Sequence, residues 1–247
     1  METTMRRDGR LPSELRPLII KPGMVNRCDG AIRLALDRTE VIVAIHGPYE
    51  SKRSRECPDR ATLDVVVLPP SGRSGSLQRE FQLLVLRALQ QVIIAGHYPH
   101  TIIQVVIQVM LDDGALLSAA LNAASLALAR AGVSLRGMIA VVTFALMPTG
   151  QAFLDPTADE QQGATSVTTL CYLLHCGAWE ADDLGQLLLS HVQGTLERSE
   201  YDMLNEWAQK AALAVAASKR HALQRSFVSL QLLSRLNCRR SSDLTPL

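Results

Sequence analysis

The stretch Thr101-Ile-Ile-Gln-Val-Val-Ile-Gln-Val-Met110 carries the clearest structural signal in the chain. Its odd positions are apolar from residue 103 to residue 109, whereas two of its even positions are glutamines. Successive side chains of a strand point to opposite faces, so this alternation predicts a half-buried β-strand. The segment Leu117–Ala131 that follows is rich in alanine and leucine and ends at Gly132, which predicts a buried helix.

Similar patterns extend from this strand and helix in both directions. Apolar runs between turn residues predict strands, and apolar residues three and four positions apart predict helices. The expected order begins with a hairpin at 31–36 and 41–45, a strand at 62–68, a helix at 76–92, a strand at 101–110, a helix at 117–131, and strands at 138–146, 151–154 and 167–174. A short helix follows, which Asp182 or Asp183 begins and whose inward residues are Leu184, Leu187, Leu188 and His191. The last element is a helix from Glu200 to about Arg235. This order indicates an α+β fold, with a mixed sheet covered by helices.

Composition and local sequence suggest one globular domain with a loose segment at each end. The 247 residues carry 25 Lys plus Arg against 24 Asp plus Glu, and 47% are hydrophobic, which excludes a disordered chain and a highly basic nucleic-acid coat protein. Residues 1–24 are polar and contain three prolines, so we expect an extended N-terminal arm. After this arm we expect a single domain over residues 25–237 and a flexible tail over residues 238–247.

The chain carries no sequence signal for a membrane or for secretion. Its longest apolar run, Met138–Met147, is much shorter than the roughly 20 residues of a transmembrane helix. The N-terminal residues Met1–Arg10 contain no apolar region, so no secretory signal is expected. Five cysteines, an odd number in a core-rich chain, favour free thiols and a reducing compartment.

Three groups of residues could carry chemistry, and each also has a plainer interpretation. Cys171, His175 and Cys176 are three possible zinc ligands, but a structural zinc site needs four, so we favour no metal. The segment 72–76, Gly-Arg-Ser-Gly-Ser, could bind a phosphate on backbone N–H groups, although a flexible linker is the simpler interpretation. A set of carboxylates could bind Mg²⁺, but ordinary turn and cap chemistry is favoured for its members, which are Asp112, Asp113, Asp155, Asp159 and Glu160.

Basic residues gather in two places. The connection after the hairpin could hold a phosphate chain, although acids are interspersed among its basic residues Lys52, Arg53, Arg55 and Arg60. The C-terminal helix carries late basic residues that complement a helix dipole and require no function, namely Lys219, Arg220, Arg225 and Arg235.

A collinear series of short segments resembles the RNase PH family. The series spans residues 26 to about 175 and consists of Asn26-Arg-Cys-Asp-Gly-Ala31, Ala44-Ile-His-Gly-Pro48, Arg60–Val66, Gln78-Arg-Glu-Phe81, Tyr98-Pro-His-Thr-Ile102, Asp113-Gly114, Ala119–Ser125, Ala131-Gly-Val133 and Phe153-Leu-Asp-Pro-Thr157 followed by Glu160. The resemblance implies an RNase PH-like fold, which is of the ribosomal protein S5 domain 2 type and agrees with the α+β pattern.

The resemblance also implies an activity that this sequence lacks the residues to perform. Active members of the family shorten RNA 3′ ends by phosphorolysis, with an arginine and backbone donors holding the phosphate and acids serving Mg²⁺ and proton transfer. Here the phosphate turn is Gly114-Ala-Leu-Leu-Ser118, so Leu117 replaces the arginine. No acidic residue occurs between Glu160 and Glu180, where active members carry one. We therefore expect no catalytic residue, no metal, no cofactor and no enzyme activity.

Partners follow from the same resemblance. It implies a non-catalytic ring subunit of the RNA exosome, in contact with other RNase PH-like ring subunits, with S1/KH cap subunits, with single-stranded RNA and with a separate catalytic exosome nuclease. Such a subunit belongs in the nucleus, including the nucleolus, and in the cytoplasm, without a membrane partner. In the family, the loop after the strand that ends in Gly-Pro lies near the RNA channel, and an RNA-contacting arginine lies at the start of a helix. The expected RNA-binding residues are therefore Lys52, Arg53, Arg55 and Arg79.

Two alternatives stay open at this point. The chain could be an active phosphate-dependent or hydrolytic 3′-to-5′ exoribonuclease, with a site rebuilt from Asp112, Asp113 and Asp155. It could also be a free homodimer that binds RNA. Its high aliphatic content predicts exposed apolar surface, including a strand edge that continues the sheet into a partner.

Overall fold

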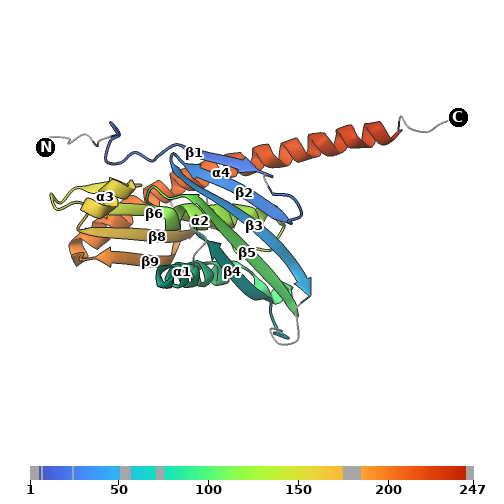
Figure 1. Ribbon diagram of the computed structural model, residues 1–247, viewed down its shortest axis with the longest axis horizontal. Helices are drawn as coiled ribbons and strands as arrows, with labels where there is room; N and C mark the ends of the chain where they lie inside the picture. Colours follow the sequence, from blue (N-terminus) through green and yellow to red (C-terminus); the bar gives the residue numbers. More distant parts are fainter. Residues whose placement is uncertain are drawn as a thin grey trace.

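The computed structural model describes residues 6, 8–23, 25–50, 57–70, 75–174 and 185–242, and for residues 76–77 and 226–242 it describes the backbone only. Figure 1 shows the arrangement of the helices and strands. In chain order they are β1 (Leu18–Pro22), β2 (Gly30–Leu36), β3 (Thr39–Glu50), β4 (Thr62–Leu68), α1 (Ser76–Val92), the 3₁₀ turn η2 (Ala95–His97), β5 (Thr101–Leu111), α2 (Leu116–Arg130), β6 (Met138–Leu146), β7 (Ala152–Leu154), α3 (Ala158–Gly163), β8 (Ser166–Leu174), β9 (Gln186–Gly194) and α4 (Arg198–Ser242).

The strands form two sheets instead of the one sheet that the element order suggests. The first has the order β1-β2-β3-β5-β4 and is mixed, because β4 and β5 run parallel. The second has the order β7-β6-β8-β9 and is antiparallel. With helices packed on both sheets, the α+β class is confirmed.

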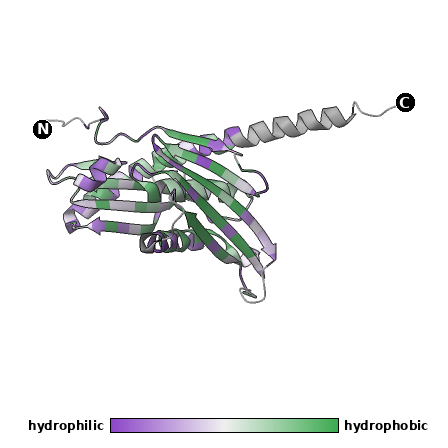
Figure 2. Cartoon of the chain, viewed as in Figure 1, coloured by the Kyte–Doolittle hydropathy of each residue, from purple (hydrophilic) through white to green (hydrophobic). Residues whose placement is uncertain are grey.

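Helix α2 lies between the two sheets and belongs to the larger core. Its side chains are buried from Leu117 to Leu128, against β2, β3 and β5 on one side and against Ile139, Val141, Cys171 and Leu173 of the second sheet on the other. The opposite face of the second sheet packs on α4 in a second core. Strand β6 is therefore covered on both faces, which explains its nearly continuous apolar sequence (Figure 2).

Most predicted elements are confirmed, but one is wrong, and strand β1 and helix α3 were not predicted. The segment 186–194 is not a helix; it forms strand β9 and pairs with β8. The predicted cap residues Asp182 and Asp183 lie outside the described residues. Helix α3 was not expected, although Thr157 and Glu160 form a capping box at its start, with Glu160 Oε2 accepting from Thr157 N at 2.9 Å.

The two terminal segments are more structured than the sequence suggests. Within the expected arm of residues 1–24, β1 pairs with β2, and the side chains of Arg6 and Arg16 are buried. Helix α4 runs to Ser242, so residues 238–242 of the expected tail are helical and extend away from the sheets (Figure 1).

Lys219 of α4 is fully buried, which corrects its sequence interpretation as one of the late basic residues that only complement the helix dipole. Its ammonium group donates to Asn122 Oδ1 at 3.2 Å, to Ser125 Oγ at 2.5 Å and to the carbonyl oxygen of Ile139 at 2.5 Å. Asn122 in turn bonds both backbone groups of Val141. This network ties α4, α2 and β6 together. Burial lowers the pKa of Lys219 to about 7, although the nearby Cys171 acts in the opposite direction.

This lowered pKa predicts that stability rises with pH. Between about pH 7 and the ordinary lysine pKa of 10.5, the unfolded chain holds a proton at Lys219 that the folded chain has released, so the free energy of unfolding increases with pH. From pH 7 to pH 9 we expect a gain of about 2–3 kcal/mol from this group. Urea unfolding at several pH values should show that Lys219→Met loses this rise and that the exposed Lys210→Met keeps it. Parallel curves for both variants and the wild type would contradict the expectation.

Candidate functional site

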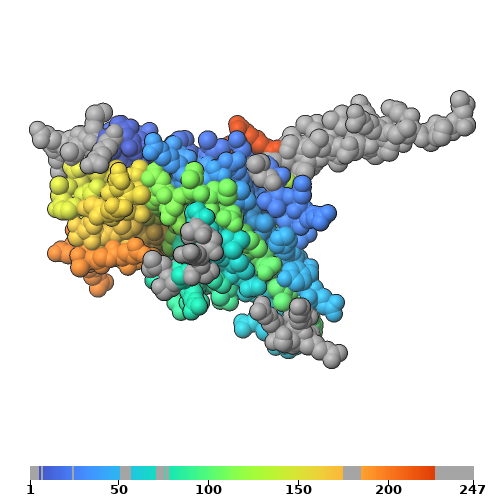
Figure 3. All heavy atoms as spheres, in the orientation of Figure 1, coloured from blue at the N-terminus to red at the C-terminus, as the bar shows by residue number. Residues whose placement is uncertain are grey.

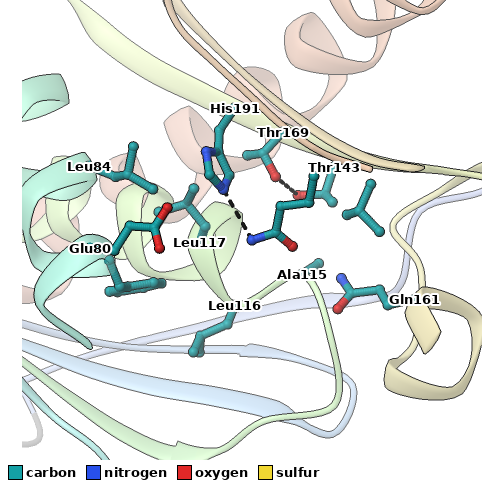
Figure 4. A pocket seen from close by; sticks show the side chains of 12 residues that line it. Glu80, Leu84, Ala115, Leu116, Leu117, Thr143, Gln161, Thr169 and His191 are labelled. Atoms are coloured by element: carbon teal, nitrogen blue, oxygen red, sulfur yellow. Dashed lines mark hydrogen bonds between the residues drawn. The ribbon is translucent and has the colours of Figure 1, made fainter. Parts of the chain in front are cut away.

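A cavity of about 260 Å³ opens at the N-terminus of α2, and Figure 4 shows the side chains around it. Six elements and their flanking turns contribute to its wall, although they are far apart in the sequence. The lining residues are Glu80, Phe81 and Leu84 of α1; Ala115, Leu116 and Leu117 at the start of α2; Thr143 of β6; Gln161 of α3; Val167 and Thr169 of β8; and His191 and Gln193 of β9. The turn that resembles the family's phosphate loop therefore faces this cavity.

The backbone before α2 explains why the turn has this sequence. Gly114 has φ +84°, and a Cβ atom on it would lie 2.6 Å from the carbonyl oxygen of Pro156. Ala115 also has a positive φ, 52°, and acts as the N-cap of α2 without a side-chain cap. Glycine suits this position both because it tolerates positive φ and because α3 begins directly beside it.

The cavity wall is poor in positive charge. Leu117, at the position of the family's phosphate-binding arginine, lines it with 8% of its surface exposed. Val167 and Thr169, from the segment without acids, lie on β8 at another side, and Thr143 and Thr169 bond each other at 3.1 Å. The ionisable lining residues are Glu80 and His191, and His191 Nε2 lies 3.2 Å from Gln193 Nε2 (Figure 4). This wall suits neutral polar or apolar groups better than a dianion.

Asp155, one of the possible Mg²⁺ ligands, is instead held by Arg16. Arg16 Nη2 lies 2.7 Å from Asp155 Oδ1, and both side chains are almost completely buried. The same guanidinium donates to the carbonyl oxygens of Asp113 and Gly114, at 2.9 Å and 3.2 Å. Burial lowers the pKa of Arg16, but the bond and charge of Asp155 outweigh this effect, so the net pKa is raised. Arg16 thus anchors the turn that begins α2.

Glu160 is paired in the same way with the other buried arginine. Arg6 Nε donates to Glu160 Oε1 at 2.8 Å, and the Arg6 guanidinium lies over the ring of Phe153 at 5.1 Å from its centroid. Burial raises the pKa of Glu160, but the bonds from Arg6 and from Thr157 N, with the charges of Arg6 and Arg10, bring the net pKa below its ordinary value. A carboxylate held by two arginine donors is a structural group.

The remaining carboxylates lie in turns or at the start of a helix. Asp112 Oδ1 accepts from Gly114 N at 3.2 Å, Asp113 Oδ1 accepts from Ala158 N at 3.4 Å, and Asp159 lies in the first turn of α3. Within the described part of the chain, no group of three or more His, Cys, Asp or Glu side chains could hold a metal ion. The cluster of Asp112, Asp113 and Asp155 that the alternative nuclease would need is therefore not assembled.

The sequence-predicted binding residues are only partly placed. Lys52, Arg53 and Arg55 lie outside the described residues, and so do Gly72–Ser74 of the possible phosphate loop. Arg79 is exposed on α1, one residue before the cavity-lining Glu80. Of the possible zinc ligands, Cys171 is buried, and burial raises its pKa to about 12, which disfavours the thiolate that zinc requires; His175 and Cys176 are outside the described residues.

Sequence reasoning missed the polar wall opposite Leu117. The sequence predicts a helix for His191, whereas on strand β9 His191 and Gln193 share the face that lines the cavity. Gln161 lies in the unexpected helix α3, and Glu80 occurred only as part of a family segment. Among the described residues, no helix combines the length and apolar content needed to cross a bilayer.

Comparison with known proteins agrees with this architecture. Residues 14–134 match the 3′ exoribonuclease family, domain 1, which is the RNase PH domain. The chain is 32% identical over 167 residues to the exosome complex exonuclease RRP46 homolog of Arabidopsis thaliana, covering 68% of this chain and 70% of that protein. It is 28% identical over 235 residues to the exosome complex component Rrp41 of Methanopyrus kandleri, covering 92% and 95%.

Solved structures support the same relationship. Rice (Oryza sativa) Rrp46 superposes with a TM-score of 0.81 at 29% identity, covering 89% of this chain and all of that one. The Archaeoglobus fulgidus exosome with RNA bound to the active site shares the fold, with a TM-score of 0.70 at 20% identity, covering 87% and 92%. The sequence Phe153-Leu-Asp-Pro-Thr157 also resembles the Rrp46 branch. The chain belongs to the RNase PH family of 3′ exoribonucleases, among relatives that are exosome components.

Proposed function

We propose that this chain is a non-catalytic subunit of an RNA exosome ring, which helps to form a channel for single-stranded RNA on its way to 3′-to-5′ processing and decay. The observation that carries the proposal is Leu117, which lines the cavity at the start of α2 where the family's active members place an arginine. The exosome membership of the relatives supports the assembly.

The chemistry of phosphorolysis explains why this replacement is decisive. Inorganic phosphate is a dianion near neutral pH, and its attack places further charge on the reacting phosphodiester, so a catalyst needs preorganised positive groups. Removing one such donor from an active site costs about 10²–10³ in rate. Here Leu117, Val167 and Thr169 provide neither a cation nor an acid.

The contacts of two acids argue against the alternative of an active nuclease. Asp155 was one of three acids available for a rebuilt catalytic centre, and its carboxylate is occupied by Arg16 at 2.7 Å. Asp113 lies in the turn that Arg16 anchors, and its carboxylate accepts from Ala158 N at 3.4 Å. A carboxylate that binds a catalytic metal ion would instead need oxygen atoms free to coordinate the ion.

RNA contact is proposed at Lys52, Arg53, Arg55 and Arg79. Basic side chains that track single-stranded RNA hold its backbone phosphates without reading bases, so the affinity depends on salt. The exposed position of Arg79 on α1 is consistent with this role. Ultraviolet crosslinking of RNA to the assembled complex should weaken when these four residues are replaced by alanine. Within the cell we place the complex, with its ring neighbours, S1/KH caps and separate nuclease, in the nucleus, the nucleolus and the cytoplasm.

The test has two arms, assembly and activity. Native affinity purification should recover the chain in a complex far larger than 27.0 kDa, together with other RNase PH-like subunits. The purified chain, incubated with end-labelled single-stranded RNA, Mg²⁺ and phosphate, should release no nucleoside diphosphate. In the complex, any nuclease activity should be unchanged by Asp113→Asn in this chain. Phosphate-dependent shortening of RNA that Asp113→Asn abolishes would overturn the proposal.

A further inference from the structure

An open groove lies between the N-terminal segment and helix α4, on the face of the second sheet that packs against α4. Its volume is about 590 Å³, which is in the range of cavities that bind ligands. Residues 12–15 form one wall, α4 forms the opposite wall, and Phe144 of β6 and Leu154 of β7 form the floor. In Figure 3 the N-terminal segment (blue) and the visible part of α4 (orange-red) lie next to each other at the upper edge of the molecule.

The groove is apolar over a length that fits a short peptide segment. Trp207 on the helix wall is 44% exposed, and the small side chains of Ala211 and Ala214 next to it leave the floor accessible. From Trp207 to Ala214 the helix rises about 10 Å, which equals about three residues of an extended chain. Large aromatic side chains beside an apolar pocket often supply most of the energy of a protein contact.

Hydrogen-bond donors on both walls are unused within the described part of the chain. The indole N–H of Trp207 and the ammonium group of Lys210 make no hydrogen bond or ion pair with any described residue. Across the groove, the backbone N–H of Ser13 is unused in the same sense, whereas the carbonyl oxygen of Pro12 accepts from Leu154 N at 2.9 Å. An extended segment between the walls could therefore find donors for its carbonyl oxygens on either side.

Charge gives the groove a direction. Lys210 is exposed on the helix wall, and Glu14 is exposed on the opposite wall, where its Oε2 accepts from Leu11 N at 3.2 Å. These two are the charged side chains that line the groove among the described residues. An occupant with an acidic group therefore places it on the α4 side, because Glu14 repels it from the other wall. Charge complementarity of this kind fixes orientation more than it adds affinity.

We propose that this groove binds a short apolar segment of a partner protein, with an acidic residue directly beside the apolar residues. The apolar side chains of the segment cover Trp207 and reach Phe144 on the floor, and the acidic side chain pairs with Lys210. The proposal goes beyond the assignment to the exosome ring and does not depend on it, because it rests on the groove alone.

Trp207 itself can report the binding. The chain contains two tryptophans, so Trp179→Phe leaves Trp207 as the single indole of the full chain. The probes are two sets of synthetic peptides with blocked ends. In the first set, apolar triplets drawn from Leu, Ile, Val and Phe precede Asp, and in the second set Lys replaces Asp. Peptides of the first set should shift the Trp207 emission to shorter wavelength, and the tightest of them should bind about tenfold better than its Lys counterpart.

Three variants in the same background locate the contact. Lys210→Glu should reverse the preference, so that the Lys peptides bind better than the Asp peptides. Ala214→Phe fills the groove and should abolish the shift. Ala217→Phe is the matched control, because Ala217 is exposed on the same helix but does not line the groove, so this variant should bind like its parent.

Several results would contradict the proposal. They are the absence of a shift with either peptide set, equal binding of the two sets, and equal effects of Ala214→Phe and Ala217→Phe. A Trp207 emission that changes with protein concentration in the absence of peptide would show that a second copy fills the groove instead. These measurements use the purified chain without RNA, whereas native purification tests the proposed function, so each idea can fail alone.

Discussion

Replacement of Arg16 by methionine is expected to lower the free energy of unfolding by about 3–5 kcal/mol. The Arg16 side chain is 1% exposed and the Asp155 side chain 5%, so the variant would leave a carboxylate buried without its partner. It would also remove donors from the carbonyl oxygens of Asp113 and Gly114, in the turn that begins α2. Urea unfolding at neutral pH, followed by circular dichroism, measures the loss.

Two further variants separate this effect from a general cost of losing an arginine. Arg33→Met removes a guanidinium that is 34% exposed and paired with Glu40, so it should cost less than about 1 kcal/mol. The double variant Arg16→Met/Asp155→Leu should recover part of the loss, because the remaining charge is gone as well. Equal losses for Arg16→Met and Arg33→Met would show that burial of the pair is not what makes it important.

Replacement of Leu117 by arginine is expected to strengthen the binding of inorganic phosphate to the cavity at the start of α2. The new guanidinium would enter a cavity of about 260 Å³ at the N-terminus of α2, where the helix dipole also favours an anion. A charge-assisted, bidentate contact of this kind should raise the affinity for inorganic phosphate by about tenfold or more. Thermal unfolding measured over a range of phosphate concentrations reports the change, since a ligand of the folded state raises stability.

The neutral variant Leu117→Gln is the control for this gain. It changes the size and polarity of the side chain without adding charge, so phosphate should stabilise it no more than the wild type. Sulfate should act like phosphate on Leu117→Arg, whereas chloride at equal ionic strength should not. If phosphate already stabilises the wild type as strongly as Leu117→Arg, the cavity binds anions without a clamp and the assignment of a non-catalytic subunit is wrong.

Elements with strong local patterns were predictable. The alternation in Thr101–Met110 defined β5, and the Ala- and Leu-rich segment before Gly132 defined α2, because burial of one face is visible in the spacing of apolar residues. Strand β9 was mistaken for a helix because Leu184, Leu187, Leu188 and His191 have helical spacing. The segment is a strand because it pairs with β8, and this pairing is not visible in the local spacing of its residues.

The candidate site divides in the same manner. Leu117 and the acid-free segment before Glu180 were recognised from the sequence through the family segments. The cavity that places Leu117 near Thr169 and His191 was not recognisable, because it joins residues from six separate elements. The ion pairs of Asp155 and Glu160 could not be predicted either, because their arginine partners are 139 and 154 positions away in the sequence.

The sequence alone determined the class of the fold, the family and the replacement of the phosphate-binding arginine, because periodicity and short motifs are local properties of the chain. The tertiary structure decided that two sheets enclose α2, that Lys219 and two arginines of the N-terminal segment are buried, and that the N-terminal segment and α4 form the walls of an apolar groove. These features depend on contacts between distant segments, and such contacts form only when burial of apolar surface outweighs the entropy of ordering the chain between them.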